Sequence, residues 1–260
     1  MARKRFGQHF LHEQGVIERI LRLLKPAADD AMVEIGPGHG ALTRPLLGLV
    51  NHLRVIEIDR DLVAQWHACA TPHLDIIEAD ALTVDYADLA TNAGQPLRLV
   101  GNLPYNISSP LLFALLAHPG AIRDMHFMLQ KEVVDRMVAT PGNRTYGRLS
   151  VALAARAAAI PLFDVGPGAF SPPPKVMSSV VRLVPRPADY PIDHWPTFDR
   201  LVTAAFTKRR KTLRNALADW LTADTIAAAG IDPGLRPERI TPAQFARLAN
   251  CAATTNKNGA

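Results

Sequence analysis

The fold is decided by the stretch Met32-Val33-Glu34-Ile35-Gly36-Pro37-Gly38-His39-Gly40. Its first four residues form a short apolar run that predicts a buried strand, and Gly36 ends that strand. The glycines that follow let the backbone approach a ligand at the carboxyl end of the strand. Gly36, Gly38 and Ala41 also satisfy the looser G-x-G-x-x-A dinucleotide fingerprint, and a tight structural turn would have the same spacing. The turn alone therefore does not identify a ligand.

Short apolar runs alternate with helical patterns on both sides of this turn. Strands are expected at residues 32–35, 53–58, 74–77, 97–100 and 125–129, and helices at 16–24, 41–49, 62–69 and from Pro110 onward. We expect Ser108 or Ser109 to cap the last of these helices, with Pro110 at its first position. This β-α-β-α order predicts an α/β fold with a mostly parallel sheet and helices on both faces.

The pattern changes near residue 140. Two more strands are expected at 157–165 and 176–184, on either side of a rigid loop at 166–174 that is rich in proline and glycine. Beyond a linker at 185–191 only helical patterns follow, at 198–207, at 213–221 and from Thr241, where Thr241 and Gln244 have capping-box spacing. We therefore expect a small all-helical domain from about residue 190 onward.

The composition is that of a globular and moderately basic protein. The 260 residues are 48% hydrophobic, which is enough for a sizeable core, and the net charge of +5 weakly indicates a polyanionic partner. Cys69 and Cys251 lie far apart and belong to no metal-like cluster, so we expect free thiols in a reducing compartment and no metal. No stretch is apolar for long enough to span a bilayer, and no signal core follows the basic start. We expect a cytoplasmic monomer without a membrane partner.

Acidic side chains follow the second and third expected strands. Glu57 and Asp59 lie roughly 20 residues after the glycines, where a carboxylate accepts hydrogen bonds from ribose hydroxyls. We favour Glu57, which is nearer the strand end, and Asp59 can instead cap the next helix. Asp80 either accepts a hydrogen bond from an adenine amine or caps the segment that follows it. Such strand ends suit an adenosine-containing ligand, which includes both a nicotinamide cofactor and a methyl donor.

The turn after the fourth strand distinguishes between these two ligands. It reads Gly101-Asn102-Leu103-Pro104-Tyr105-Asn106-Ile107 and combines an amide, a proline-fixed turn and an aromatic ring. The exocyclic amine of adenine is a poor nucleophile, because its lone pair is delocalised into the ring. If the Asn102 oxygen and a backbone carbonyl each accept one amine hydrogen, the lone pair is directed at the methyl donor. Tyr105 offers a face for the base to stack on; a strand-to-helix turn with an exposed tyrosine is the plainer interpretation.

The chain closely resembles the ribosomal RNA adenine dimethyltransferase family over nearly its whole length. The matching segments are residues 5–11, 34–40, 57–59, 80–81, 102–108, 128–132, 146–150, 170–176 and 206–215. The resemblance implies a Rossmann-like class I methyltransferase domain at 1–188, which binds S-adenosylmethionine, and a helical RNA-binding domain at 189–260. It also implies dimethylation of two adjacent adenosines in a hairpin near the 3′ end of small-subunit (16S) ribosomal RNA, in an assembling small ribosomal subunit.

The resemblance also assigns the site residues. By matching position, the donor would contact His9, Leu11, Gly36, Glu57, Asp80 and Asn102. Many relatives have asparagine where this chain has His9, and imidazole also offers a polar contact. The catalytic residues would be Asn102, Leu103, Pro104, Tyr105 and Phe170. Phe170 begins a Phe-x-Pro-x-Pro-x-Val segment and would sandwich the target base with Tyr105; the alternative is that it fills the core.

The densest basic run is Lys208-Arg209-Arg210-Lys211-Thr212-Leu213-Arg214, which lies between two expected helices. We expect Lys208, Arg209, Arg210, Lys211 and Arg214 to bind RNA phosphates, which position RNA without reading its sequence. A solvated helix corner is the alternative interpretation.

Three other functions compete with RNA methylation. An oxidoreductase would use the same glycine turn but would leave Asn102 and Tyr105 without a role. A binding factor that kept the fold would bind the donor without turnover, and the intact acids and turn argue against it. A DNA adenine methyltransferase is the closest rival, since such enzymes commonly have aspartate or asparagine, two prolines and an aromatic residue at this point. Leu103 in place of the first proline favours RNA by resemblance.

Overall fold

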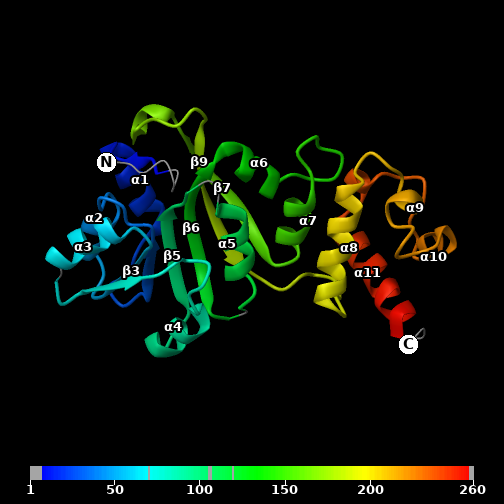
Figure 1. Cartoon of the computed structure of the whole chain (residues 1–260), viewed down its shortest axis with the longest axis horizontal. Coiled ribbons are helices and arrows are strands. Elements are labelled where there is room, and N and C mark those ends of the chain that lie inside the picture. Colours follow the sequence, from blue (N-terminus) through cyan, green and yellow to red (C-terminus); the bar gives the residue numbers. More distant parts are fainter. Residues whose placement is uncertain (1–7, 70, 105–106, 119, 258–260) are drawn as a thin grey trace. The chain divides into compact units, whose positions relative to one another are not determined.

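The computed structural model describes residues 8–69, 71–104, 107–118 and 120–257 of the chain (Figure 1). Its contacts define two compact units, the first formed by Met1–Val134 and Ile160–Pro185 and the second by Asp135–Ala159 and Arg186–Ala260. This division differs from the expected boundary after residue 188, because the segment Asp135–Ala159 contributes Val151 and other apolar side chains to the core of the C-terminal helices. The assignment of a catalytic and an RNA-binding domain stays a prediction.

The first unit is built on a seven-stranded sheet with the strand order β4-β3-β2-β5-β6-β9-β7. The strands are β2 (Met32–Ile35), β3 (Leu53–Glu57), β4 (Leu74–Glu78), β5 (Leu97–Asn102), β6 (Ile122–Gln130), β7 (Ala157–Val165) and β9 (Ser178–Pro185). The five strands from β4 to β6 run parallel, and β9 pairs antiparallel with β6. The expected α/β fold with a mostly parallel sheet is therefore confirmed.

The centre of this sheet is a topological switch point. From β2 the chain proceeds to β3 and β4 on one side, and β5 returns to the other side of β2. The carboxyl ends of these parallel strands lie along one edge of the sheet, where open α/β sheets bind their ligands. Gly36 and Asn102 thus come together at the switch point, although 66 positions separate them in the sequence.

Helices flank the parallel strands, with bounds close to those expected. They are α1 (Gln14–Leu24), α2 (Thr43–Leu47), α3 (Arg60–Ala68), α4 (Tyr86–Ala93) and α5 (Ser108–Leu115). The expected serine cap of α5 is wrong: the cap position is Ile107, and the Ser108 hydroxyl donates instead to the Pro104 carbonyl at 3.1 Å. α4 was not expected, because only Tyr86 and Ala90 of its eight residues are buried, which is too weak an apolar pattern.

A buried ion network lies at the amino end of β5, far along the strand from Asn102. Arg98 donates to Asp30 at 2.6 Å and to Asp124 of β6 at 2.9 Å, and all three side chains are at most 6% exposed. The same guanidinium donates to the carbonyl of Leu24 at 2.7 Å, at the end of α1. This network ties β5 to its neighbours, so that the strand carrying Asn102 is held at both ends.

The second unit is helical. It contains α7 (Arg148–Ala154), α8 (Trp195–Thr207), α9 (Leu213–Ala216), α10 (Ala223–Ala228) and α11 (Pro242–Lys257), while α6 (Lys131–Met137) spans the division. α8 and α11 pack side by side, as the yellow and red helices of Figure 1 show. The expected capping box is confirmed, because the Thr241 amide donates to the Gln244 side chain at 2.9 Å and the Gln244 amide donates to the Thr241 hydroxyl at 3.2 Å.

Candidate active site

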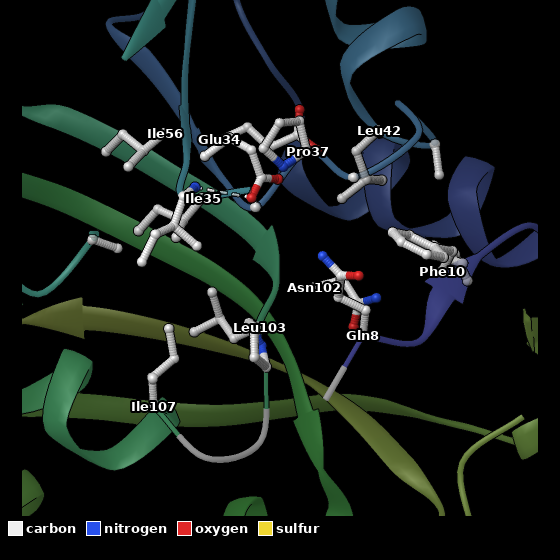
Figure 2. Close-up of a pocket in the computed structure, with 18 of the residues that line it drawn as sticks. Gln8, Phe10, Glu34, Ile35, Pro37, Leu42, Ile56, Asn102, Leu103 and Ile107 are labelled. Carbon is white, nitrogen blue, oxygen red and sulfur yellow. Dashed lines mark hydrogen bonds between the residues drawn. The ribbon is translucent and has the colours of Figure 1, made fainter. Parts of the chain in front are cut away.

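A cavity of about 310 Å³ opens at the carboxyl edge of β2, β3, β4 and β5 (Figure 2). In this view the side chains of Glu34 and Pro37 lie above those of Asn102 and Leu103. The cavity lining includes all six residues that the resemblance assigned to the methyl donor, namely His9, Leu11, Gly36, Glu57, Asp80 and Asn102. Residues from five segments that lie apart in the sequence therefore line one cavity, as a single donor site requires.

The glycine turn packs against an aromatic side chain. Gly38 and Gly40 have φ angles of 54° and 89°, a left-handed backbone that favours glycine. A Cβ atom on Gly40 would lie 2.6 Å from the Trp66 ring, and Trp66 Nε1 donates to the Gly38 carbonyl at 3.1 Å. Trp66 on α3 therefore fixes the shape of the turn. Sequence reasoning missed this role, since nothing in the local pattern around Trp66 indicates a contact 28 residues away.

Glu57 lies at the end of β3 and Asp59 begins the next helix, as expected. The Asp59 carboxylate accepts from the Asp61 amide at 3.1 Å and caps α3, whereas the 6% exposed Glu57 lines the cavity. Burial raises the pKa of Glu57, although the backbone amides of Asp59, Ile58 and Gly38 stabilise the carboxylate and lower it. A carboxylate has about four acceptor positions, so capacity for a ribose hydroxyl remains.

Asp80 caps the segment after β4 and also lines the cavity. Its Oδ1 accepts from the Leu82 amide at 2.9 Å, which stabilises the turn after β4, and the half-buried side chain also lines the cavity. The turn contact orients the carboxylate, so the two interpretations made from the sequence are compatible.

Glu34 also lines the cavity, although no role for it was predicted from the sequence. It is 2% exposed, and the Thr43 hydroxyl donates to its Oε2 at 2.7 Å. Burial raises the pKa of Glu34 to about 8, while the Thr43 hydrogen bond lowers it and nearby Glu57 raises it further. Glu34 is therefore protonated near neutral pH.

Asn102 ends β5 with its amide group in a defined orientation. Its Nδ2 donates to the backbone carbonyl of His9 at 2.8 Å. A carbonyl only accepts hydrogen bonds, so the NH₂ group must face His9 and the Oδ1 atom is turned away from it. The His9 ring is held in turn, because its Nδ1 lies 2.7 Å from the Pro172 carbonyl and must carry the proton that is donated there.

The backbone on either side of Asn102 is held closely. A Cβ atom on Gly101 would lie 2.5 Å from the Ile35 carbonyl oxygen, so only glycine lets β5 approach the end of β2 this closely. Leu103 is 1% exposed, and its amide donates to the Met128 carbonyl at 3.1 Å. Leu103 and Pro104 line the cavity, while Tyr105 lies outside the described residues.

Phe170 lies in the core and does not line the cavity. It belongs to the short strand β8 (Phe170–Ser171), which pairs antiparallel with β1 (Phe10–Leu11), and it is 3% exposed. Its neighbours in the apolar cluster include Leu11 and Val165. This placement agrees with the alternative that Phe170 fills the core, and its role in stacking on a target base stays a prediction.

The basic run forms the turn between α8 and α9. Lys208 pairs with Asp219 at 3.3 Å and Arg209 with Glu238 at 2.9 Å. Arg210, Lys211 and Arg214 are exposed, and no ion pair involves them within the part of the chain that the structure describes. The break between two helices is therefore confirmed, and these three side chains lie on the surface of the turn.

Comparison with known proteins identifies relatives over the full length. The family model described as ribosomal RNA adenine dimethylase matches residues 1–254. A ribosomal RNA small subunit methyltransferase A from Erwinia tasmaniensis is 52% identical over 252 residues, which cover 96% of this chain and 92% of that protein. A protein of the same name from Marinobacter nauticus is 51% identical over 259 residues, covering 98% and 93%.

Solved structures give the same result for the fold. A dimethyladenosine transferase from Plasmodium falciparum superposes with a TM-score of 0.77 at 25% identity, covering 96% of this chain and 98% of that one. The 23S rRNA methyltransferase ErmE superposes with a TM-score of 0.70 at 25% identity, covering 94% and 99%. The expected class I methyltransferase architecture is therefore confirmed.

Proposed function

Because the chain belongs to the ribosomal RNA adenine dimethylase family, we propose that it dimethylates the exocyclic amines of two adjacent adenosines of small-subunit (16S) ribosomal RNA, in a hairpin near the 3′ end. Methyl transfer from S-adenosylmethionine to adenine in RNA is the activity of this family. The single observation that carries the mechanism is the orientation of Asn102, whose amide is held by the His9 carbonyl at the edge of the cavity.

The cavity residues fit S-adenosylmethionine. The left-handed glycine turn brings backbone close to the cavity, and the carboxyl oxygens of Glu57 can accept from ribose hydroxyls. Ile58 lines the same cavity and is 46% exposed, which leaves an apolar surface for a flat adenine ring, and Asp80 can accept from its amine. His9 and Leu11 close the cavity from the N-terminal segment. When bound, the donor supplies an electrophilic methyl group.

Asn102 activates the target amine by alignment. Since its NH₂ group is engaged with His9, its Oδ1 is the atom left to accept a hydrogen from the adenine amine. A backbone carbonyl near Asn102 accepts the second hydrogen. With both hydrogens held, the nitrogen becomes pyramidal and its lone pair is directed into the cavity. The amine loses its proton to solvent after the attack, so no strong general base is required.

Aromatic side chains hold the base in this position. Tyr105, which lies outside the described residues, follows Pro104 directly and stacks on the adenine, an interaction that contributes roughly 1–3 kcal/mol. Phe170 completes the sandwich only if the segment that carries it moves, because its side chain is buried next to Leu11. Leu103 takes part by anchoring the turn.

The basic turn binds the RNA backbone. Arg210, Lys211 and Arg214 contact phosphates first, and Lys208 and Arg209 join when their acidic partners are displaced.

The substrate is the assembling small ribosomal subunit. The protein acts on it as a cytoplasmic monomer during biogenesis, without a metal. No helix in the described part of the chain is long and apolar enough to cross a membrane.

Methyl transfer from labelled S-adenosylmethionine to an RNA hairpin, compared with a DNA hairpin of the same sequence, tests this proposal. We expect label on the adenine amines of the RNA and little on the DNA. Equal labelling of the two hairpins would identify the DNA adenine methyltransferase instead. Tight binding of a nicotinamide dinucleotide without methyl transfer would favour the oxidoreductase.

A further inference from the structure

A second hollow lies entirely within the helical unit. This open groove of about 360 Å³ is lined by Arg148 of α7, by Asp199, Arg200, Thr203 and Ala204 of α8, and by Trp220. It contains none of the residues of the basic turn at 208–214. We refer to these six lining residues as the α8 groove.

The α8 groove combines an aromatic face with positive charge. The Arg200 guanidinium carbon lies 5.1 Å from the centroid of the Trp220 ring, which makes a cation–π pair on the groove wall. The acidic residue of the groove, Asp199, forms an ion pair with Arg156, which donates to both of its carboxylate oxygens at 2.9 and 2.7 Å. The positively charged residues of the groove are Arg148 and Arg200, and both are exposed.

The α8 groove is followed along α8 by the basic turn. Arg200 and Ala204 lie four residues apart on one face of α8, which ends at Thr207, and Lys208 follows at its C-cap. Lys208 reaches Asp219, the residue directly before Trp220. A single strand bound along this face therefore meets first the Arg200–Trp220 pair and then the cations of the turn.

We propose that the α8 groove is a second RNA site, which binds one unpaired nucleotide of the ribosomal RNA. Its base stacks on the Arg200–Trp220 pair, and its phosphate is bound by Arg148 and Arg200. Unpaired bases stack on aromatic rings and on guanidinium planes, whereas a base within a duplex does not offer its face. The inference rests on the proposed function, because it takes ribosomal RNA as the substrate.

Fluorescence titration of the full-length protein with an eight-nucleotide oligouridylate tests this proposal. Stacking of a base quenches tryptophan emission, and the chain has two other tryptophans, Trp66 and Trp195. We expect quenching in the wild type, loss of most of it in Trp220→Phe, and no change in Trp195→Phe, a matched control because Trp195 also carries a stacked arginine. Trp220→Ala should lower the affinity about tenfold, the effect of losing one stacked base.

The arginine contribution is tested with a second set of probes. Arg200→Ala should lower the slope of log affinity against log salt by about 1, whereas Arg247→Ala, an exposed arginine of α11 outside the groove, should not. An abasic ribose-phosphate oligomer should bind Trp220→Ala as well as it binds the wild type. An RNA duplex of equal length should not quench Trp220. Thermal unfolding of each variant verifies that it is folded.

These experiments can refute the RNA site in the α8 groove and the methyltransferase function independently of each other. If the wild type methylates ribosomal RNA but Trp220→Ala and Arg200→Ala bind oligouridylate normally, the α8 groove is not an RNA site and the enzymatic function stands. If those variants lose affinity for small subunits but not for oligouridylate, the groove binds a protein and the proposal is overturned. If the wild type transfers no methyl group to RNA, the proposed function fails, whatever the titrations show.

Discussion

Replacing Asn102 by alanine removes both functions of its amide at once. The Oδ1 acceptor for the adenine amine is lost, and so is the 2.8 Å hydrogen bond from Nδ2 to the His9 carbonyl. The loss of one preorganised hydrogen-bonding group at a reacting centre lowers kcat by roughly 10²–10³-fold, or about 2.7–4 kcal/mol. We expect Asn102→Ala to lower the rate of methyl transfer by at least that much.

The cost to folding should be far smaller. His9 is only half-buried, so water replaces the lost donor, and one hydrogen bond of this kind contributes about 0.5–1.5 kcal/mol. The variant should therefore unfold cooperatively and keep its affinity for RNA. A matched variant, Asn102→Asp, keeps an acceptor oxygen but loses the donor to His9, and it should retain more activity than Asn102→Ala.

The assay is single-turnover methyl transfer with enzyme in excess over small subunits, which separates chemistry from product release. Donor affinity is measured in parallel by calorimetry. A transfer rate within about threefold of the wild type in Asn102→Ala would refute the alignment mechanism, given the loss expected for such a group. A rate loss explained in full by weaker donor or RNA binding would refute it as well.

Three further predictions concern the cavity and the sheet. Glu57→Ala should weaken donor binding roughly 10–100-fold, as loss of a hydrogen bond to a charged group does, measured by calorimetry; unchanged affinity would exclude Glu57 from the site. The folded protein keeps the proton of Glu34 up to a pKa of about 8, while the unfolded chain loses it near 4.5, so the free energy of unfolding should fall as the pH rises through that window. Glu34→Gln should reduce this decline in urea titrations at several pH values, and an identical pH slope would contradict it. Arg98→Met removes the buried guanidinium that Asp30 and Asp124 share, so that they keep only the more exposed Arg123 and Arg182, and it should lower the free energy of unfolding by about 3–5 kcal/mol. The control Arg123→Met, whose side chain is 61% exposed, should lower it by less than about 1 kcal/mol, and equal losses would contradict the role of the buried network.

The strands of the sheet and the acidic residues at their ends could be predicted from the sequence, because burial of a strand determines which residue types occur along it. Strands buried on both faces, such as Met32–Ile35, read as short and mostly apolar runs, and glycine or an acid follows or ends several of them. The choice of Glu57 over Asp59 also followed from local order, since the residue beyond the strand end is placed to cap the next helix.

Contacts between residues that are far apart in the sequence produce no local pattern and could not be predicted. The Asn102 amide is oriented by a carbonyl 93 residues earlier, and Trp66 shapes a turn 28 residues earlier. The Arg98 network lies within a strand that reads as apolar, and its partners Asp30 and Asp124 come from two other segments. The burial of Phe170 could not be predicted either, because the family motif identifies the residue but not the core in which its side chain is packed.

Mass-spectrometric mapping of the modified nucleotides tests the central claim most directly. Small ribosomal subunits that lack the modification are incubated with the wild-type protein and labelled S-adenosylmethionine, and their ribosomal RNA is then digested and sequenced. The proposed function predicts two methyl groups on the exocyclic nitrogen of each of two adjacent adenosines near the 3′ end. Methyl groups on any other atom or nucleotide, or none at all although the donor binds, would contradict it.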